Sequence, residues 1–292
     1  MSEYPAVDII TIGYNSLPFL NDFFLGLSRL EYPSDQCTLF FVDNGSCDGS
    51  AEFVEKIHLN FKVEVVRNKK NYGFAKASNM ILRRSLADFV GLLNPDTRTD
   101  KNWLAALVRT MCASEDVGMA SSRRIPQEAP RYINPATQET SWCSGGHCLI
   151  RRRALEKVGY FDERFFMYGE DVDLSWRMWL GGYRCVYVPD SICEHHYGRE
   201  ESFKTRRVYY HVRNSILLRY RYGTFFEIRN AYLRWAREGM SLFVKKLRFK
   251  EAFPVLAALF GHIPHIGYFL LTRAPVKKKE NFLVVKDKWI RL

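Results

Sequence analysis

Short apolar runs alternate with amphipathic stretches along the first 93 residues, and this alternation restricts the possible folds. The runs at 7–12, 38–42, 63–66 and 89–93 are rich in Ile, Val, Phe and Leu, as buried strands are. Helical spacing of apolar residues follows the first three of them, over 20–30, 50–59 and 74–86. Because strands joined by helices need crossover connections, the sequence predicts an α/β fold whose mostly parallel sheet has helices on both faces. Ligands bind beyond the carboxyl ends of the strands in such sheets.

The pattern is less regular after residue 100. A helix is expected over 102–112, strands over 117–120, 146–150, 186–188 and 190–194, and a helix that ends at Gly181-Gly182. A polar loop through Pro126, Pro130 and Pro135 separates the first two of these strands, and we expect it to cover a second substrate.

Charge divides the chain near residue 200. Residues 1–200 have 23 basic and 26 acidic side chains, a net charge of −3, whereas residues 201–292 have 20 and 6, a net charge of +14. We therefore expect one domain over 1–200 and a basic helical region over 201–292, with helices over 202–222 and after Thr224, where Glu227 completes a capping-box pattern. Such a region attracts nucleic acid or an anionic lipid surface.

Residues 252–272 contain no Asp, Glu, Lys or Arg, and the segment is long enough to cross a bilayer. Pro254, His262, Pro264 and His265 interrupt it. Two short helices, either at a membrane interface or packed in a core, are therefore the favoured interpretation over a membrane span.

The composition excludes several classes of protein. With 292 residues, 47% of them hydrophobic, the chain can bury a large core and is not disordered. Its seven cysteines include no Cys-x-x-Cys pair, so a reduced compartment is expected and a zinc or redox site is not. The first residues are neither basic nor apolar, so we expect no secretory signal and a cytoplasmic location.

Three acidic motifs are candidates for chemistry. Asp43 ends the second predicted strand, where a carboxylate can accept a hydrogen bond from a base or ribose; the alternative is a turn capped by Ser50. Asp96, in Asn94-Pro95-Asp96, follows the fourth strand and can hold a divalent metal, since Mg²⁺ needs only one or two protein carboxylates; the alternative is a solvated turn.

The third motif, Glu170-Asp171-Val172-Asp173, starts a helix behind an aromatic stretch. Nearby aromatic side chains desolvate a carboxylate and make it a better base, whereas acids in a first helical turn can also merely complement the helix dipole. His195 and His196 point to opposite sides of an extended segment, so at most one of them reaches a metal; an ordinary core or surface histidine is the alternative.

Taken in order, five motifs resemble those of family 2 glycosyltransferases of the inverting, GT-A-fold kind, over about residues 5–200. They are Gly13-Tyr14-Asn15, the segment 42–46, the segment 71–75 with Asn79, Asn94-Pro95-Asp96, and Gly169-Glu170-Asp171. The resemblance implies a Rossmann-like domain that binds a nucleotide-sugar and a divalent metal, then delivers the sugar to an acceptor hydroxyl.

The resemblance also implies a role for each matched residue. Asp171 would be the catalytic base, and Asp96 and His195 would hold Mg²⁺ or Mn²⁺. The donor would contact Tyr14, Asn15, Asp43, Asn44, Asn71, Gly73, Asn79, Asn94 and Asp96. The acceptor-site candidates are Gly145, Gly146, Glu170, Trp176 and Arg177.

Two departures from the family pattern matter. The common Asp-x-Asp metal motif is Asn94-Pro95-Asp96 here, so one metal carboxylate is missing. The Gln-x-x-Arg-Trp motif of polymerising members is absent, which favours transfer of a single sugar. The Asn-Pro-Asp variant and the segment 166–177 look most like the bacterial rhamnosyltransferases, whose donor is dTDP-L-rhamnose. Transfer of galactofuranose or an N-acetylhexosamine from a UDP-sugar stays open.

The expected acceptor is a lipid-linked glycan used in cell-surface polysaccharide synthesis, with the basic region placing the enzyme peripherally at the inner face of the plasma membrane or packing on the catalytic domain. A sugar nucleotidyltransferase is disfavoured because the loop at 13–16 is not a Gly-rich, basic phosphate loop. A catalytically inactive scaffold that binds nucleotide-sugar or RNA is the remaining alternative, although nucleic acid is not the expected partner.

Overall fold

The computed structural model describes residues 4–126, 132–195, 204–245 and 247–274, which divide into two compact units. The first unit contains the described residues up to 162 together with 171–195, and the second contains 163–170 and the described residues from 204 onward. We call them the sheet unit and the helical unit. The segment 163–170, which lies in the chain between β7 and β8, thus belongs to the helical unit.

A single sheet of eight strands forms the centre of the sheet unit, in the order β3-β2-β1-β4-β7-β6-β8-β5. Their bounds are β1 Val7–Gly13, β2 Cys37–Asp43, β3 Lys62–Arg67, β4 Phe89–Leu93, β5 Thr97–Thr99, β6 Val117–Ile125, β7 His147–Arg151 and β8 Arg184–His195.

The sheet is mixed. The pairs β1–β2, β1–β4, β2–β3 and β6–β8 are parallel, and β4–β7, β6–β7 and β5–β8 are antiparallel. The α/β class expected from the sequence is confirmed, with antiparallel strands in its second half. These pairings fix the relative direction of the strands. The same edge of the sheet therefore holds the ends of β2, β1, β4 and β8 and the start of β7.

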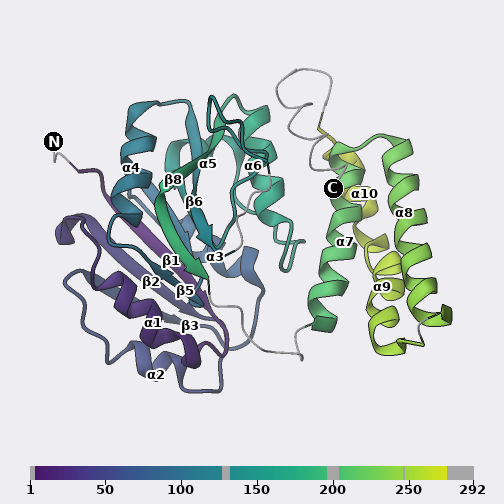
Figure 1. Ribbon diagram of the computed structural model, residues 1–292, viewed down its shortest axis with the longest axis horizontal. Helices are drawn as coiled ribbons and strands as arrows, with labels where there is room; N and C mark the ends of the chain where they lie inside the picture. The colour runs from purple at the N-terminus through teal and green to yellow at the C-terminus, as the bar shows by residue number, and fades with distance from the viewer. Residues whose placement is uncertain (1–3, 127–131, 196–203, 246, 275–292) are drawn as a thin grey trace. The chain divides into compact units, whose positions relative to one another are not determined.

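Helices cover both faces of this sheet (Figure 1). Leu20, Phe23 and Leu27 of α1 (Leu17–Leu27) and Trp103 and Leu107 of α4 (Trp103–Ala113) pack with Ile9, Leu39 and Leu149 of the strands in one buried cluster. Since neighbouring strand residues face opposite ways, Ile10 points to the other face. There α3 (Phe74–Leu82) contacts β1 and β2.

Some elements differ from those expected. Helix α2 (Ser50–Val54) is shorter than the predicted 50–59, and β6 is longer than the predicted 117–120. Strand β8 joins two strands predicted separately. Neither β5 nor α5 (Arg152–Val158) was predicted, because a three-residue strand and a seven-residue helix with four charged residues lack a readable apolar period. The remaining helix of this region, α6, spans Glu170–Leu180.

The proline loop expected over the second substrate lies partly outside the described residues, Pro130 among them. Of its described part, Ile133 bridges Thr140, and Glu139 bridges Val186 of β8. Its predicted role as an acceptor cover stays a prediction.

The helical unit consists of α7 (Lys204–Tyr222), α8 (Phe225–Met240), a π-helical turn (Ser241–Lys245), α9 (Phe249–Gly261), a 3₁₀ turn (Ile263–His265) and α10 (Ile266–Leu271). Its core joins Val212 and Ile216 of α7, Ala231 of α8, and Val255 and Ala258 of α9. The predicted capping box is confirmed: the Glu227 backbone N–H donates to Oγ1 of Thr224 at 3.2 Å, and the Glu227 side chain accepts from the Thr224 N–H.

The uncharged segment near residue 260 forms two helices joined by a 3₁₀ turn, and α9 contacts both α7 and α8. Among the described residues, one helical stretch, Phe249–Leu271, is long and apolar enough to cross a membrane by length and composition. Only 28% of its most apolar 18-residue segment is buried.

Within the helical unit, Asn214 of α7 holds the segment that precedes α6. Its buried side-chain amide donates to the carbonyl oxygens of Met167 at 2.9 Å and Tyr168 at 2.6 Å. Tyr168 (φ +66°) and Gly169 (φ +90°) are both left-handed. A non-glycine residue in this conformation is uncommon, and the two hydrogen bonds stabilise the turn.

Candidate active site

The sheet directs several polar loops to one edge. In the β1–β2 ladder Gly13 pairs with Asp43, and in the β4–β7 ladder Leu93 pairs with His147. The loops that follow β2, β1 and β4 therefore leave from three adjacent strands, with the loop that precedes β7 beside them. This edge is where α/β sheets bind ligands.

The loops after β1 and β2 form one hydrogen-bonded unit. The Asn15 N–H donates to Oγ of Ser46 at 2.9 Å, and Oδ1 of Asn15 accepts from the Cys47 N–H at 3.0 Å. Asp48 accepts from the Leu17 N–H at 3.0 Å and from Ser50. Burial acts to raise the pKa of Asp48, but these hydrogen bonds outweigh it and hold the pKa below its usual value. An Asx-type turn at Asp48-Gly49-Ser50 was the alternative weighed for the Asp43 motif, and it is present, although Gly49 and not Ser50 is the N-cap of α2.

Asp43 lies at the base of these loops with 4% of its surface exposed. Its Oδ2 accepts from the Ser46 N–H at 3.2 Å, whereas Oδ1 is buried and accepts no hydrogen bond from the described residues. Buried carboxylate oxygens rarely lack a donor in folded proteins. A ligand N–H or O–H group is therefore a fitting partner for Oδ1.

Asn44 differs from the expectation that it contacts the donor. Its Nδ2 donates to Asn71 and to the Gly73 carbonyl, at 3.1 and 3.3 Å. Its Oδ1 accepts from Asn68 and the Tyr72 N–H, at 3.1 and 3.0 Å. A side-chain amide has two donor hydrogens and two acceptor lone pairs, so Asn44 is fully used in holding the loop after β3. We revise its role from donor contact to loop support.

Asn79, on α3, is also used inside the fold. Its Nδ2 donates to the Phe161 carbonyl at 2.9 Å and its Oδ1 accepts from the Phe161 N–H at 3.1 Å, and the residue is 1% exposed. This expected donor contact is therefore a clamp on the segment after α5. The other expected donor contacts lie in two loops: Tyr14 and Asn15 follow β1, and Asn71 and Gly73 follow β3. Asn71 accepts a hydrogen bond from the Gly73 N–H at 2.8 Å.

Asp96 and His195 come together across two strands. Thr97 of β5 pairs with His195 of β8, and this register brings Oδ2 of Asp96 to 3.5 Å from Nε2 of His195. Both side chains are partly accessible, 28% and 15% exposed. A carboxylate oxygen and an imidazole nitrogen at this separation suit Mn²⁺ or Mg²⁺. His196, its neighbour, lies outside the described residues.

Gly145 and Gly146 connect Asp171 to the loop after β4. The Gly145 N–H donates to Oδ2 of Asp171 at 3.2 Å, and the Gly146 carbonyl accepts from the Asn94 N–H at 2.8 Å. A Cβ on Gly146 would lie 2.7 Å from Nδ2 of Asn94, so a larger residue here would displace the Asn94 side chain. Two consecutive glycines thus place the Asp171 carboxylate beside the Asn94-Pro95-Asp96 loop.

Exposure separates the three acids at the start of α6. Glu170 is 5% exposed and Asp173 is fully buried, whereas Asp171 is partly exposed. Asp173 pairs with Nε of Arg177 at 2.9 Å. Asp171 is therefore the most accessible acid of this motif, and its role as the base stays a prediction.

Three acceptor-site candidates are corrected by burial and hydrogen bonding. Trp176 is fully buried, and Glu170 is nearly so. Arg177 donates to the carbonyl oxygens of Val158, Gly159 and Tyr160 at 2.6–2.8 Å besides its ion pair with Asp173. These side chains support α6. The spacing of apolar residues predicted that they lie on a helix, but not which segments of the chain bury them.

His147 was not foreseen as part of this region. It is 1% exposed, and neither ring nitrogen has a hydrogen-bond partner among the described residues. Burial, with the positive charge of Arg124, lowers the pKa of His147 to about 3, so the ring is neutral at physiological pH. The one sign in the sequence that His147 belongs to this region is its place directly after Gly145-Gly146, at the start of a strand.

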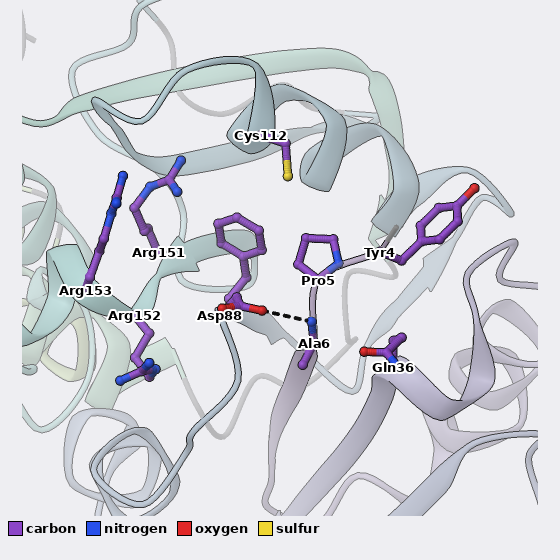
Figure 2. A pocket seen from close by; sticks show the side chains of 10 residues that line it. Tyr4, Pro5, Ala6, Gln36, Asp88, Cys112, Arg151, Arg152 and Arg153 are labelled. Atoms are coloured by element: carbon purple, nitrogen blue, oxygen red, sulfur yellow. Dashed lines mark hydrogen bonds between the residues drawn. The ribbon is translucent and has the colours of Figure 1, made fainter. Parts of the chain in front are cut away.

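A separate pocket opens at the opposite edge of the sheet, where β1 and β4 begin (Figure 2). Asp88 there accepts from the Ala6 N–H at 3.2 Å. The pocket is basic, but Arg151 donates to the Val117, Met111 and Ser114 carbonyls, Arg152 to Ala87 and Glu156, and Arg153 pairs with Glu115. Its arginines thus serve the fold, and the pocket is not part of the candidate site.

Sheet, loops and acidic residues together define the class of GT-A nucleotide-sugar transferases. A family model described as Glycosyl transferase family 2 matches residues 8–176, more than half of the chain, and a second model, Glycosyl transferase family group 2, matches residues 136–272. The chain belongs to glycosyl transferase family 2, and it is a hexosyltransferase.

Relatives agree with this assignment. The chain is 26% identical over 238 residues, 65% of this chain and 76% of the relative, to N-acetylglucosaminyl-diphospho-decaprenol L-rhamnosyltransferase of Mycobacterium tuberculosis. It is 24% identical over 211 residues to poly-beta-1,6-N-acetyl-D-glucosamine synthase of Staphylococcus aureus, covering 66% of this chain and half of that protein. The expected resemblance to bacterial rhamnosyltransferases is thus confirmed.

Solved structures share the fold. The mannosyltransferase PcManGT of Pyrobaculum calidifontis, in complex with GDP-mannose and Mn²⁺, superposes with a TM-score of 0.64 at 19% identity, covering 99% of this chain and 81% of that one. Residues 1–349 of S. aureus TarS give 0.61 at 16% identity, covering 98% and 91%.

Proposed function

We propose that this enzyme transfers a single sugar, with inversion and assistance from a divalent metal, from a nucleotide-sugar to an acceptor hydroxyl. The observation that carries the proposal is the position of Asp171. Its carboxylate is partly exposed, fixed by the Gly145 N–H, and linked through Gly146 to the loop that bears Asp96. A base for the acceptor and a group that holds the donor diphosphate thus meet at one strand edge.

The reaction follows from this arrangement. Asp171 takes the proton of the acceptor hydroxyl while that oxygen attacks the anomeric carbon. The bond from this carbon to the phosphate oxygen breaks on the opposite face, and the nucleoside diphosphate leaves with the bonding electrons. Attack opposite the leaving group inverts the anomeric centre. Asp43, through its buried Oδ1, would accept a hydrogen bond from the ribose or base.

Asp96 and His195 would hold Mg²⁺ or Mn²⁺ in this site. When bound, the metal neutralises charge on the diphosphate leaving group. No group of three or more metal-ligating side chains occurs among the described residues. A site of two protein ligands suits metals whose other positions are taken by phosphate oxygens and water. Mn²⁺ is the first metal to test, because the structure of PcManGT contains Mn²⁺.

The preferred donor is dTDP-L-rhamnose. Support comes from the Asn94-Pro95-Asp96 variant and from the M. tuberculosis relative, whose name specifies L-rhamnosyl transfer. A UDP-sugar that donates galactofuranose or an N-acetylhexosamine is the second candidate, favoured by the S. aureus relative, whose name specifies an N-acetylglucosamine polymer.

The proposed acceptor is a hydroxyl of a lipid-linked glycan in cell-surface polysaccharide synthesis. The M. tuberculosis relative is named for a sugar on diphospho-decaprenol, a lipid-linked acceptor. An enzyme with such a substrate works at a membrane, and a cytoplasmic location, peripheral on the inner face of the plasma membrane, fits the basic region after residue 200. Nucleic acid is not a proposed partner.

A donor panel tests the proposal. Thermal unfolding is measured with dTDP-L-rhamnose, UDP-galactofuranose and UDP-N-acetylglucosamine, each with and without Mn²⁺, followed by transfer to a lipid-linked N-acetylglucosaminyl diphosphate. Stabilisation by one donor, larger with Mn²⁺, and inverted product are expected. Binding without any transfer would support an inactive scaffold, and stabilisation by a UDP-sugar alone would replace rhamnose as the donor.

A further inference from the structure

Exposed apolar side chains gather in one part of this protein. Among the described residues, thirteen of the eighteen exposed large hydrophobic side chains lie between residues 225 and 271 of the helical unit. Scattered exposed apolar residues are ordinary, but a concentration of this kind marks a surface that meets another apolar phase.

Helix α9 has two apolar faces with different surroundings. Ala252, Val255 and Ala258 are buried, and the helix contacts α7 and α8. Phe253 and Phe260, seven residues apart and so two turns along one side, are 72% and 70% exposed. Leu271, at the end of α10, is 89% exposed. No charged residue interrupts the chain between Glu251 and Arg273.

Helix α8 repeats the pattern and adds positive charge. Phe226, Leu233 and Met240 recur every seven residues and are 59%, 44% and 50% exposed. Arg229 and Arg237 lie three or four residues from members of this stripe, and the Arg229 guanidinium is 4.7 Å from the Phe226 ring centroid. Apolar rings beside guanidinium groups suit the boundary between acyl chains and phosphate headgroups.

Charge over the rest of the helices has the same sign. Among the residues from 205 to 274 whose side chains the structure describes, all but 245 and 246, eight Lys or Arg side chains are exposed, compared with two Glu side chains. The exposed surface is thus complementary to an anionic lipid layer, which attracts each such cation. The cores of protein interfaces, in contrast, are depleted of charge.

The packing also indicates how the helices meet the bilayer. A Cβ on Gly239 of α8 would lie 2.7 Å from Leu256 of α9, so the two helices are in close contact. If α9 crossed the membrane, α8 would enter with it and bring Arg229, Arg234 and Arg237 into the hydrocarbon, at high cost. A helix pair lying in the interface keeps these arginines at the headgroups.

We infer that the exposed faces of α8, α9 and α10 form a lipid-binding surface that lies in the plane of an anionic membrane without spanning it. We call it the α8–α10 face, and its apolar members are Phe226, Leu233, Met240, Phe253, Phe260 and Leu271. The surface deepens the proposed peripheral location, and it does not depend on the identity of the donor or on Asp171.

Vesicle co-sedimentation of the full chain tests this surface. The wild type is expected to bind vesicles containing phosphatidylglycerol and to bind pure phosphatidylcholine more weakly. The double variant Phe253→Gln/Phe260→Gln should lose about tenfold or more in vesicle partition, given the apolar area of two aromatic rings. Leu86→Gln, at a side chain 86% exposed in the sheet unit, is the matched control and should bind as the wild type does.

Charge variants and a soluble acceptor separate the possible outcomes. Arg229→Gln/Arg237→Gln should weaken binding to anionic vesicles and leave the residual binding to phosphatidylcholine unchanged. Every variant should transfer sugar to a soluble acceptor at the wild-type rate, which distinguishes failure of the surface from failure of the proposed reaction. Equal vesicle binding by the wild type and the phenylalanine variant would overturn the inference, as would a dimer that the phenylalanine substitutions dissociate.

Discussion

Replacing Asp171 by asparagine removes the proposed proton acceptor and keeps the side-chain shape. Oδ1 of Asp171 accepts from the Val172 N–H at 2.8 Å, and Oδ2 accepts from the Gly145 N–H at 3.2 Å. An asparagine keeps one oxygen, so one of these N–H groups loses its acceptor. The expected loss of stability is about 1–2 kcal/mol.

The expected effect on the reaction is larger. Proton transfer to a placed base contributes about 10² to 10⁴ in rate, which corresponds to about 3–5 kcal/mol in the barrier. Release of nucleoside diphosphate in the presence of acceptor should therefore slow by this factor in Asp171→Asn. The KM for the donor should stay nearly unchanged, because the groups assigned to the donor are on other loops.

A neighbouring acid provides the matched control. Asp173 is fully buried and paired with Arg177, whose side chain is 19% exposed, so Asp173→Asn leaves a partly buried guanidinium without its carboxylate. It should lower stability by about 3–5 kcal/mol and retain turnover per folded molecule. A wild-type rate for Asp171→Asn, with Asp173→Asn inactive although folded, would refute the assignment of the base.

Three further predictions concern other parts of the site. Because the native pKa of His147, about 3, lies below the ordinary value, the unfolded chain binds the extra proton and stability should fall as pH drops below about 6.5. His147→Gln should reduce the slope of the unfolding free energy against pH in this acidic range by up to about 1.4 kcal/mol per pH unit, as measured by chemical denaturation. An unchanged slope would count against the buried neutral ring. Asp96→Ala should abolish the extra thermal stabilisation that Mn²⁺ gives with donor; persistence of that increment would place the metal elsewhere. Asn214→Ala, which removes two hydrogen bonds to the turn before α6, should cost about 1–3 kcal/mol, whereas the exposed Asn230→Ala should stay within about 0.5 kcal/mol in the same urea titration.

The sequence predicted much of the first half of the sheet, for a physical reason. Buried strands and amphipathic helices of ordinary length have readable periods, so β1, β2, β3 and β4 were located to within a residue or two. The acids at Asp43 and Asp96 followed, because residues at strand ends in an α/β sheet share one edge.

What covers a side chain was less predictable. The period of α6 placed Trp176 and Arg177 on a helix, but the segments that bury and bind them lie elsewhere in the chain. Asn44 matched a donor motif, yet its hydrogen bonds depend on where the loop after β3 ends. The segment 163–170 likewise belongs to the helical unit because of long-range contacts such as those of Asn214. No pattern in the local sequence predicts such contacts.

In the proposed reaction, Asp43, Asp96 and Asp171 surround one nucleotide-sugar. Anomalous diffraction from crystals grown with Mn²⁺ and dTDP-L-rhamnose or a UDP-sugar would locate the metal and the donor relative to these three carboxylates. We expect a manganese peak beside the Asp96 carboxylate, with the nucleoside next to Asp43 and the sugar facing Asp171. A manganese and nucleotide bound together at another surface, with these three carboxylates unliganded, would contradict it.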